Sequence, residues 1–189
     1  MTTTFDHDEF VNACLAAIGE DDPIGAVREV VERAVSDPAS IARTYEVPLD
    51  PDNDGILHRS SDLFITQVVF PRGFCTGLHD HTIPAIIGVW GGYEDNLVYR
   101  TDGARVLDGG QRHRVEPGQV LTLGAKDAHD VHAPDGGWSG ALHVYLGDLI
   151  SLERGAWETV DGERGIYDGA EQERRWTEVG KATGLFRTE

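Results

Sequence analysis

The N-terminal part of the chain carries its apolar residues at the spacing of a helix face. Between residues 6 and 45, apolar side chains recur every three or four positions. The pairs Asp22-Pro23 and Asp37-Pro38 each supply an N-cap residue followed by proline at the first helical position. We therefore expect an N-terminal helical segment that contains more than one short helix.

From residue 56 the pattern changes to short apolar runs that are separated by glycine-containing turns. The run 63–70 is rich in β-branched and aromatic residues, as strands are. Further strands are expected at 83–90, 93–100, 104–108, 111–115, 119–123, 129–133 and 138–146. Short strands at a spacing of roughly ten residues are typical of a β-sandwich or barrel.

The last part of the chain is more polar, and its periodicity is weaker. Short helices are expected at 149–156 and 176–185. A length of 189 residues suits one domain. We expect helices within 1–50, a barrel core over 56–147 and a C-terminal extension over 148–189.

Composition narrows the choice of partners. The chain has 33 acidic and 16 basic residues, a formal charge of −17, which repels phosphate backbones and anionic membranes. Neither nucleic acid nor a membrane is therefore an expected partner. The two cysteines form no disulfide framework, and the first residues lack the basic and apolar regions of a signal peptide. These features predict a cytoplasmic protein.

The histidines carry the clearest chemistry. His79 and His81 are two residues apart, so on a strand both imidazoles face the same side of the sheet and can share a metal ion. A turn, a strand and a second turn precede His129, which would return it to this pair in an antiparallel barrel. His143 and Tyr145 alternate in the same way and share a face, although a core role for His143 is an open alternative.

These residues resemble the cupin superfamily and, within it, the thiol dioxygenases that act on cysteine or 3-mercaptopropionate. The resemblance covers roughly residues 60–155. His79-Asp80-His81-Thr82 is similar to the family's His-Asp-His-Thr, and His143-Val144-Tyr145 to its His-Val-Tyr. The resemblance implies a mainly β fold, the cupin double-stranded β-helix barrel. It implies Fe(II) bound by His79, His81 and His129, with Ni, Zn or Mn as possible metals in purified protein, and His143 with Tyr145 as the catalytic outer-sphere pair.

Three positions depart from the family patterns. Ordinary cupins have a glutamate ligand where this chain has Ala85 and Ile86, and Glu94 lies too far along the chain to be counted. Ile86 also replaces the cysteine that some cysteine dioxygenases crosslink to tyrosine. Ala141 replaces the family's serine two residues before the outer-sphere histidine, so the relay is reduced to His143 and Tyr145.

Two arginines are candidates for binding a substrate carboxylate. Arg154 follows His143 by eleven residues, the spacing found in the mercaptopropionate enzymes, although a surface role for it is equally open. Arg59 precedes the first long strand, as the corresponding arginine does in cysteine dioxygenase. A guanidinium binds a carboxylate through two parallel hydrogen bonds.

The expected function is an Fe(II)-dependent dioxygenase, a non-haem iron enzyme that uses O2 to oxidise a small, carboxylate-bearing thiol to a sulfinic acid. Three neutral ligands leave the full charge on the metal, which favours an anionic thiolate. There are two alternatives. One is a three-histidine cupin enzyme that catalyses carbon–carbon cleavage or a lyase reaction on a non-thiol substrate. The other is a non-catalytic cupin that binds a metal or a small ligand. A monomer or homodimer is expected.

Overall fold

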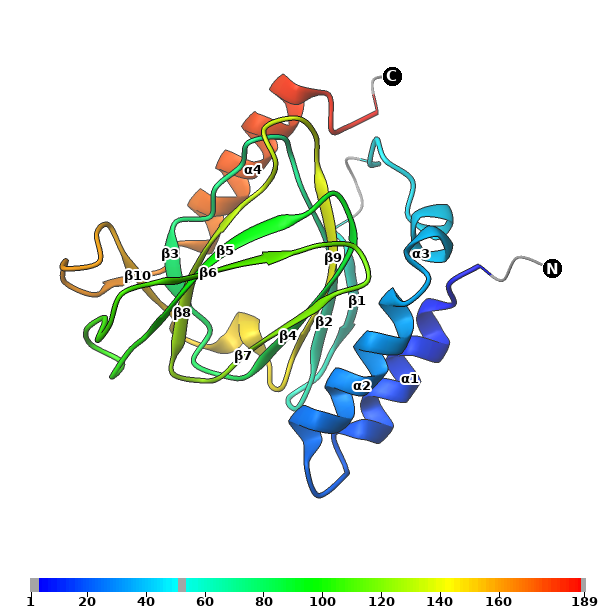
Figure 1. Ribbon diagram of the computed structural model, residues 1–189, viewed down its shortest axis with the longest axis horizontal. Coiled ribbons are helices and arrows are strands. Elements are labelled where there is room, and N and C mark those ends of the chain that lie inside the picture. The colour runs from blue at the N-terminus through cyan, green and yellow to red at the C-terminus, as the bar shows by residue number, and fades with distance from the viewer. Residues whose placement is uncertain (1–3, 51–53, 188–189) are drawn as a thin grey trace.

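Two antiparallel sheets form a barrel that carries helices on two sides. The computed structural model describes residues 4–50 and 54–187. Three N-terminal helices lie against the outer face of one sheet, and a C-terminal helix lies on the other side of the barrel (Figure 1). The prediction of a mainly β barrel with an N-terminal helical segment is confirmed.

The N-terminal helices begin where the sequence predicted. Their bounds are α1 His7–Ala17, α2 Pro23–Val35 and α3 Pro38–Thr44. The side chains of Asp6, Asp22 and Asp37 each accept a hydrogen bond from a backbone N–H of the first helical turn. These caps satisfy donors that have no partner inside the helix.

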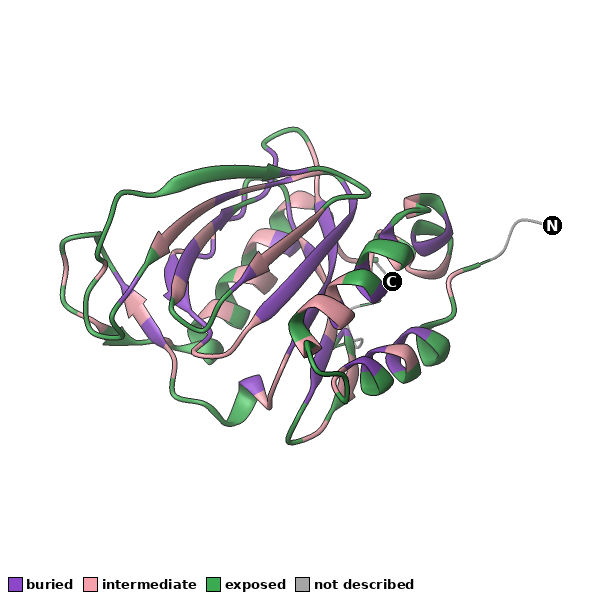
Figure 2. Ribbon diagram, turned by 60° about the horizontal axis from the view of Figure 1, so that its bottom comes forward, coloured by how far each residue is buried: buried purple, intermediate pink, exposed green. Residues whose placement is uncertain are grey.

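The first sheet has the strand order β1-β2-β9-β4-β7. Its strands are β1 Ile56–Arg59, β2 Phe64–Phe70, β4 Ala85–Gly91, β7 Val120–Leu123 and β9 Ser139–Tyr145. Every residue of β4 and β9 is buried, and Figure 2 shows the buried strands between the N-terminal helices and the barrel interior. Because both faces of β4 are buried, its sequence is apolar almost throughout instead of alternating between apolar and polar residues.

The second sheet has the strand order β11-β10-β3-β8-β5-β6. Its strands are β3 Leu78–Asp80, β5 Glu94–Arg100, β6 Gln111–Val115, β8 Asp127–His132, β10 Gly155–Trp157 and β11 Gly165–Ile166. The C-terminal helix α4 spans Gly169–Thr183. No helix in the described ranges combines the length and the apolar character needed to cross a bilayer.

Helix α2 packs against β4 at a glycine. A Cβ atom on Gly88 would lie 2.5 Å from Val31 Cγ1 and 2.8 Å from Val35 Cγ1. We expect Gly88→Ala to lower the free energy of unfolding by about 1–3 kcal/mol, because the added methyl overpacks this contact. Urea denaturation measures the change. Gly109→Ala is the matched control, since no atom of the described residues lies within 4 Å of the place that its added methyl would take; equal losses in both variants would contradict the packing argument.

Several predicted elements differ from the structure. Residues 104–108 form no strand, and a single bridge joins Thr101 to Val106. The helix expected at 149–156 is only a 3-10 turn, η1 Leu149–Ser151, followed by strand β10. The helix expected at 176–185 begins earlier, because Asp168 caps α4, and ends at Gly184, whose φ is 74°.

Candidate metal centre

Three histidines meet inside the barrel. His79 on β3 lies directly opposite His129 on β8 in the strand register. His81 follows one residue after β3 ends. The ring centroids of the three imidazoles are 4.8–5.1 Å apart, and each ring offers a nitrogen within 4.8 Å of the others. The predicted trio is therefore brought together within reach of a single ion.

Hydrogen bonds fix the orientation of two of these rings. His79 Nδ1 donates to the carbonyl oxygen of Gly77 at 2.9 Å, and His129 Nδ1 donates to Asn96 Oδ1 at 2.8 Å. The neutral rings of His79 and His129 therefore both carry their proton on Nδ1, which leaves Nε2 with a lone pair for a metal. Such partners hold metal-binding histidines in position in other proteins.

Burial keeps the three histidines neutral. Loss of hydration lowers the pKa of His79 to about 4 and holds the pKa values of His81 and His129 well below the usual range. Neutral imidazole is the form that binds a metal. Three neutral nitrogen ligands in a closed interior fit a divalent transition metal such as Fe(II), Mn, Ni or Zn.

Asn96 was not predicted from the sequence, yet it is completely buried beside His129. We expect Asn96→Ala to weaken metal binding by about 10- to 100-fold, because His129 loses the acceptor that orients it. Competition with a metal chelator measures this change. Asn96→Asp retains an oxygen acceptor and should restore most of the affinity; equal loss in both variants would contradict the orienting role.

His143 and Tyr145 lie next to the three histidines. Both side chains come from the inner face of β9, and 2.9 Å separates His143 Nδ1 from the phenol oxygen. The ring of Tyr145 is 5.0 Å from that of His81. Burial raises the pKa of Tyr145 well above its usual value, so the phenol stays protonated. His143 Nε2 is buried and has no hydrogen-bond partner among the described residues.

Arg154 lies at the edge of this centre. Its guanidinium stacks 4.0 Å from the ring centre of Tyr167, and that ring is 5.1 Å from the ring of His79. The positive charge of Arg154 contributes to the lowered pKa of His79. Unlike Arg59, it has no carboxylate partner among the residues that the structure describes.

Arg59, the other predicted carboxylate binder, is already occupied. It binds Asp148 through two hydrogen bonds of 2.9 and 3.1 Å, and 47% of its side chain is exposed. The two arginines therefore differ: Arg154 forms no ion pair among the described residues. Burial raises the pKa of Asp80, and the nearby charge of Arg154 opposes this rise without an ion pair between them.

Asp80, Glu94 and Tyr167 are further residues of the centre that sequence reasoning did not select. Asp80 accepts a 2.7 Å hydrogen bond from the backbone N–H of Gly155, next to Arg154. Glu94 is completely buried, and burial raises its pKa to about 7. Among the described residues, Glu94 is not part of the metal-binding group that the three histidines form. This agrees with the expectation that Glu94 lies too far along the chain to be a ligand.

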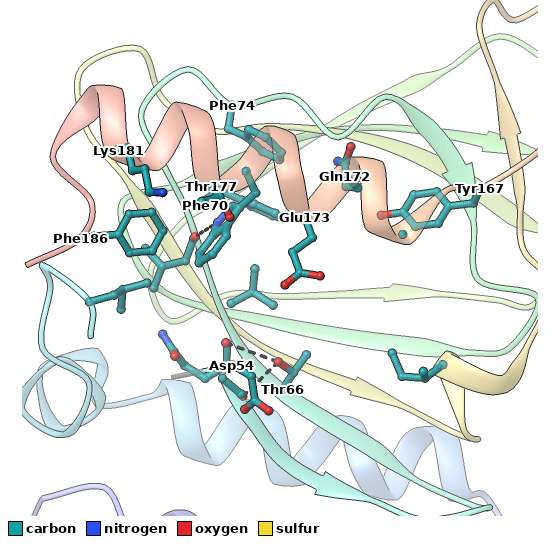
Figure 3. A pocket seen from close by; sticks show the side chains of 18 of the residues that line it. Asp54, Thr66, Phe70, Phe74, Tyr167, Gln172, Glu173, Thr177, Lys181 and Phe186 are labelled. Carbon is teal, nitrogen blue, oxygen red and sulfur yellow. Dashed lines mark hydrogen bonds between the residues drawn. The ribbon is translucent and has the colours of Figure 1, made fainter. Parts of the chain in front are cut away.

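A cavity of about 1190 Å³ adjoins the centre between β2 and α4 (Figure 3). Arg154, Tyr167, Phe70 and Phe74 contribute to its lining. The ring of Phe70 is 6.3 Å from that of His143. The cavity is large enough for a small organic molecule and brings such a molecule next to Arg154.

No family model matches the chain. It is similar over half its length to the crystal structure of the dimethylsulfoniopropionate (DMSP) lyase DddQ from Ruegeria pomeroyi, with 21% identity and a TM-score of 0.41. An oxalate oxidase bound to glycolate is similar over 46% of the chain (13% identity, TM-score 0.41), and oxalate decarboxylase from Bacillus subtilis over 47% (16%, 0.39). The matches span 43%, 43% and 22% of those three proteins.

Proposed function

We propose that the protein is an Fe(II)-dependent dioxygenase that converts a small carboxylate-bearing thiol to a sulfinic acid. The observation that carries the proposal is the pairing of three buried, neutral histidines with a guanidinium that lacks a carboxylate partner among the described residues. The resemblance of the two histidine motifs to those of thiol dioxygenases supports the same reaction.

The ligand set suits a substrate that binds as an anion. His79, His81 and His129 carry no charge of their own, so a divalent ion at this centre keeps its full positive charge. When bound, Fe(II) would supply coordination of the thiolate and activation of O2. The whole chain has a formal charge of −17, so its surface does not attract an anion. An anionic substrate would therefore be held by the local positive charges of the metal ion and Arg154.

The protein side chains would bind the substrate and control its protons. Arg154 would hold the carboxylate through two hydrogen bonds from its planar guanidinium. Tyr145 and His143 form a hydrogen-bonded pair that faces the centre, where they would orient the substrate and stabilise developing negative charge on oxygen. Burial of the centre keeps bulk water away from the reacting sulfur.

The overall reaction balances without an added reductant. The thiol RSH and one O2 give the sulfinic acid RS(O)OH, so the S–H and O–O bonds break while two S–O bonds and one O–H bond form. Sulfur is oxidised while both oxygen atoms are reduced and retained in the product. One O2 is therefore consumed for each sulfinate formed.

Oxygen consumption by the iron-loaded protein tests this proposal. Apoprotein would be loaded anaerobically with one equivalent of Fe(II) and supplied separately with 3-mercaptopropionate, cysteine and cysteamine. We expect O2 uptake with a carboxylate-bearing thiol and one sulfinate, identified by mass spectrometry, for each O2 used. Tyr145→Phe should bind iron normally but turn over more slowly.

The alternative chemistry of a three-histidine centre gives a different outcome. Iron binding without O2 uptake on any of the three thiols would overturn the thiol dioxygenase proposal. Cleavage of, or elimination from, a non-thiol carboxylate under the same conditions would favour the second alternative. Retention of an unaltered ligand would favour a binding protein.

A further inference from the structure

A second group of potential metal ligands lies on the opposite face of β8 from His129. Asp130 and His132 alternate along the strand and point away from the barrel interior, whereas His129 points inward. An isolated β-bridge places Cys75 opposite His132. A thiol, a carboxylate and an imidazole are thereby gathered from two segments of the chain.

One ligand atom from each of the three residues lies within 4.8 Å of the other two, which is within reach of one ion. Cys75 Sγ is 3.6 Å from His132 Nε2 and 3.1 Å from Asp130 Oδ1, and His132 Nε2 is 2.9 Å from Asp130 Oδ2. Tetrahedral zinc with usual bond lengths would separate such donors by about 3.3–3.6 Å. The sulfur–nitrogen distance already matches. Asp130 now contacts Sγ and Nε2 with its two different oxygens, and it would turn to present one of them to the ion.

We propose that Cys75, Asp130 and His132 bind Zn²⁺, with water as the fourth ligand. Thiolate and imidazole are preferred ligands of zinc, and the carboxylate completes a donor set with two negative charges that neutralise the ion. The site is open to solvent, because 48% of the His132 side chain and 20% of the Asp130 side chain are exposed. Zn²⁺ would displace the thiol proton that Cys75 now donates to Asp130, and the ring proton that His132 Nε2 now donates to Asp130 would move to Nδ1.

Zinc at this position would connect segments that carry the inner histidines. Cys75 precedes His79 by four residues, and Asp130 and His132 share β8 with His129. Arg175 of α4 also donates to the Cys75 carbonyl oxygen, at 3.2 Å. An ion here would link the segment before β3 to strand β8, beside the contact with α4, and we expect it to raise the midpoint of thermal unfolding.

Co²⁺ in place of Zn²⁺ gives a direct test, because a thiolate bound to Co²⁺ produces a near-ultraviolet charge-transfer band. The inner histidines contain no sulfur, so they cannot contribute to this band. Cys14, the other cysteine, is completely buried in α1, and burial raises its pKa to about 12. Because the inner histidines also take up a divalent ion, we expect the band to be complete after two equivalents of Co²⁺, and Zn²⁺ to abolish it by competition.

Variants assign the band to the three residues. Cys75→Ser should abolish it, and His132→Ala should weaken Co²⁺ binding at this site by at least about 10-fold. Cys14→Ala and His113→Ala are the controls, and both should keep the band. Absence of a band in the unmodified protein, or a band that is insensitive to His132→Ala, would overturn the proposal.

The outcome is independent of the proposed dioxygenase activity. In Cys75→Ser, zinc analysis should show the loss of one bound ion while the inner histidines keep theirs. Loss of thiol oxidation without loss of the cobalt band would instead argue against the proposed function alone. The two sites can therefore succeed or fail separately.

Discussion

Replacement of His129 with alanine is expected to remove bound iron and to lower the rate of thiol oxidation by more than about 100-fold. Loss of a hydrogen-bond partner of a metal-binding histidine commonly costs about 10- to 100-fold in metal affinity, and loss of the ligand itself costs more. His129 is 2% exposed, so water cannot readily replace the missing nitrogen. Iron content of the purified variant and O2 uptake measure the two effects.

His113→Ala is the matched control for this variant. His113 lies on β6, the edge strand of the same sheet, but its side chain is exposed and is not among the potential metal ligands in the described residues. We expect it to retain iron and activity. If His129→Ala kept one tightly bound iron and near-normal turnover, the three-histidine centre would not be the site of the reaction. Circular dichroism of both variants separates loss of metal from loss of folding.

The three inner histidines could be predicted because simple alternation and strand return determine their positions. His79 and His81 share a face by their spacing, and the turn before His129 brings that strand back beside them. The strand itself was not predicted: β3 has only three residues, too few for a detectable period. The histidines were found through their own spacing and through the motif.

Residues that support the centre could not be predicted, because long-range pairing places them there. Asn96 reaches His129 only because β5 pairs with β8. Tyr167 reaches His79 because the polar segment before α4 folds back over the barrel edge. Neither residue belongs to a local pattern, and each depends on the register of strands that are distant in the sequence.

The incorrect local predictions also have physical reasons. Residues 104–108 alternate weakly, but the turn at Asp102 and Gly103 ends pairing after one bridge. The helix expected at 149–156 is interrupted because Gly155 and Ala156 pair with β11, and Ala156 and Trp157 pair with β3. Edge pairing in the second sheet thus overrides the weak helical pattern.

This edge pairing bears directly on Arg154. The hydrogen bond from Gly155 to Asp80 ties the residue after Arg154 to the residue between His79 and His81. The same motif that provides two metal ligands therefore also anchors the backbone beside the guanidinium. Asp80 is a positioning residue in this arrangement, and the distance between Arg154 and the metal centre follows from the β3–β10 register.

Arg154→Gln is expected to raise the KM for 3-mercaptopropionate by about 10- to 100-fold, because hydrogen bonds to a charged group contribute about 1.5–3 kcal/mol. The KM for cysteamine, which has no carboxylate, should change little. Arg154→Lys should recover only part of the loss, since an ammonium cannot form the two parallel hydrogen bonds of a guanidinium. Steady-state O2 uptake with both thiols measures these differences.

Comparison with two other arginines makes the test specific. Arg72→Gln removes an exposed arginine and should leave both KM values unchanged. Arg59→Gln distinguishes the two candidates: a KM increase in that variant, with none in Arg154→Gln, would move carboxylate binding to the Arg59–Asp148 pair. Equal increases for cysteamine and 3-mercaptopropionate in Arg154→Gln would show that the arginine supports the structure of the centre rather than the substrate carboxylate.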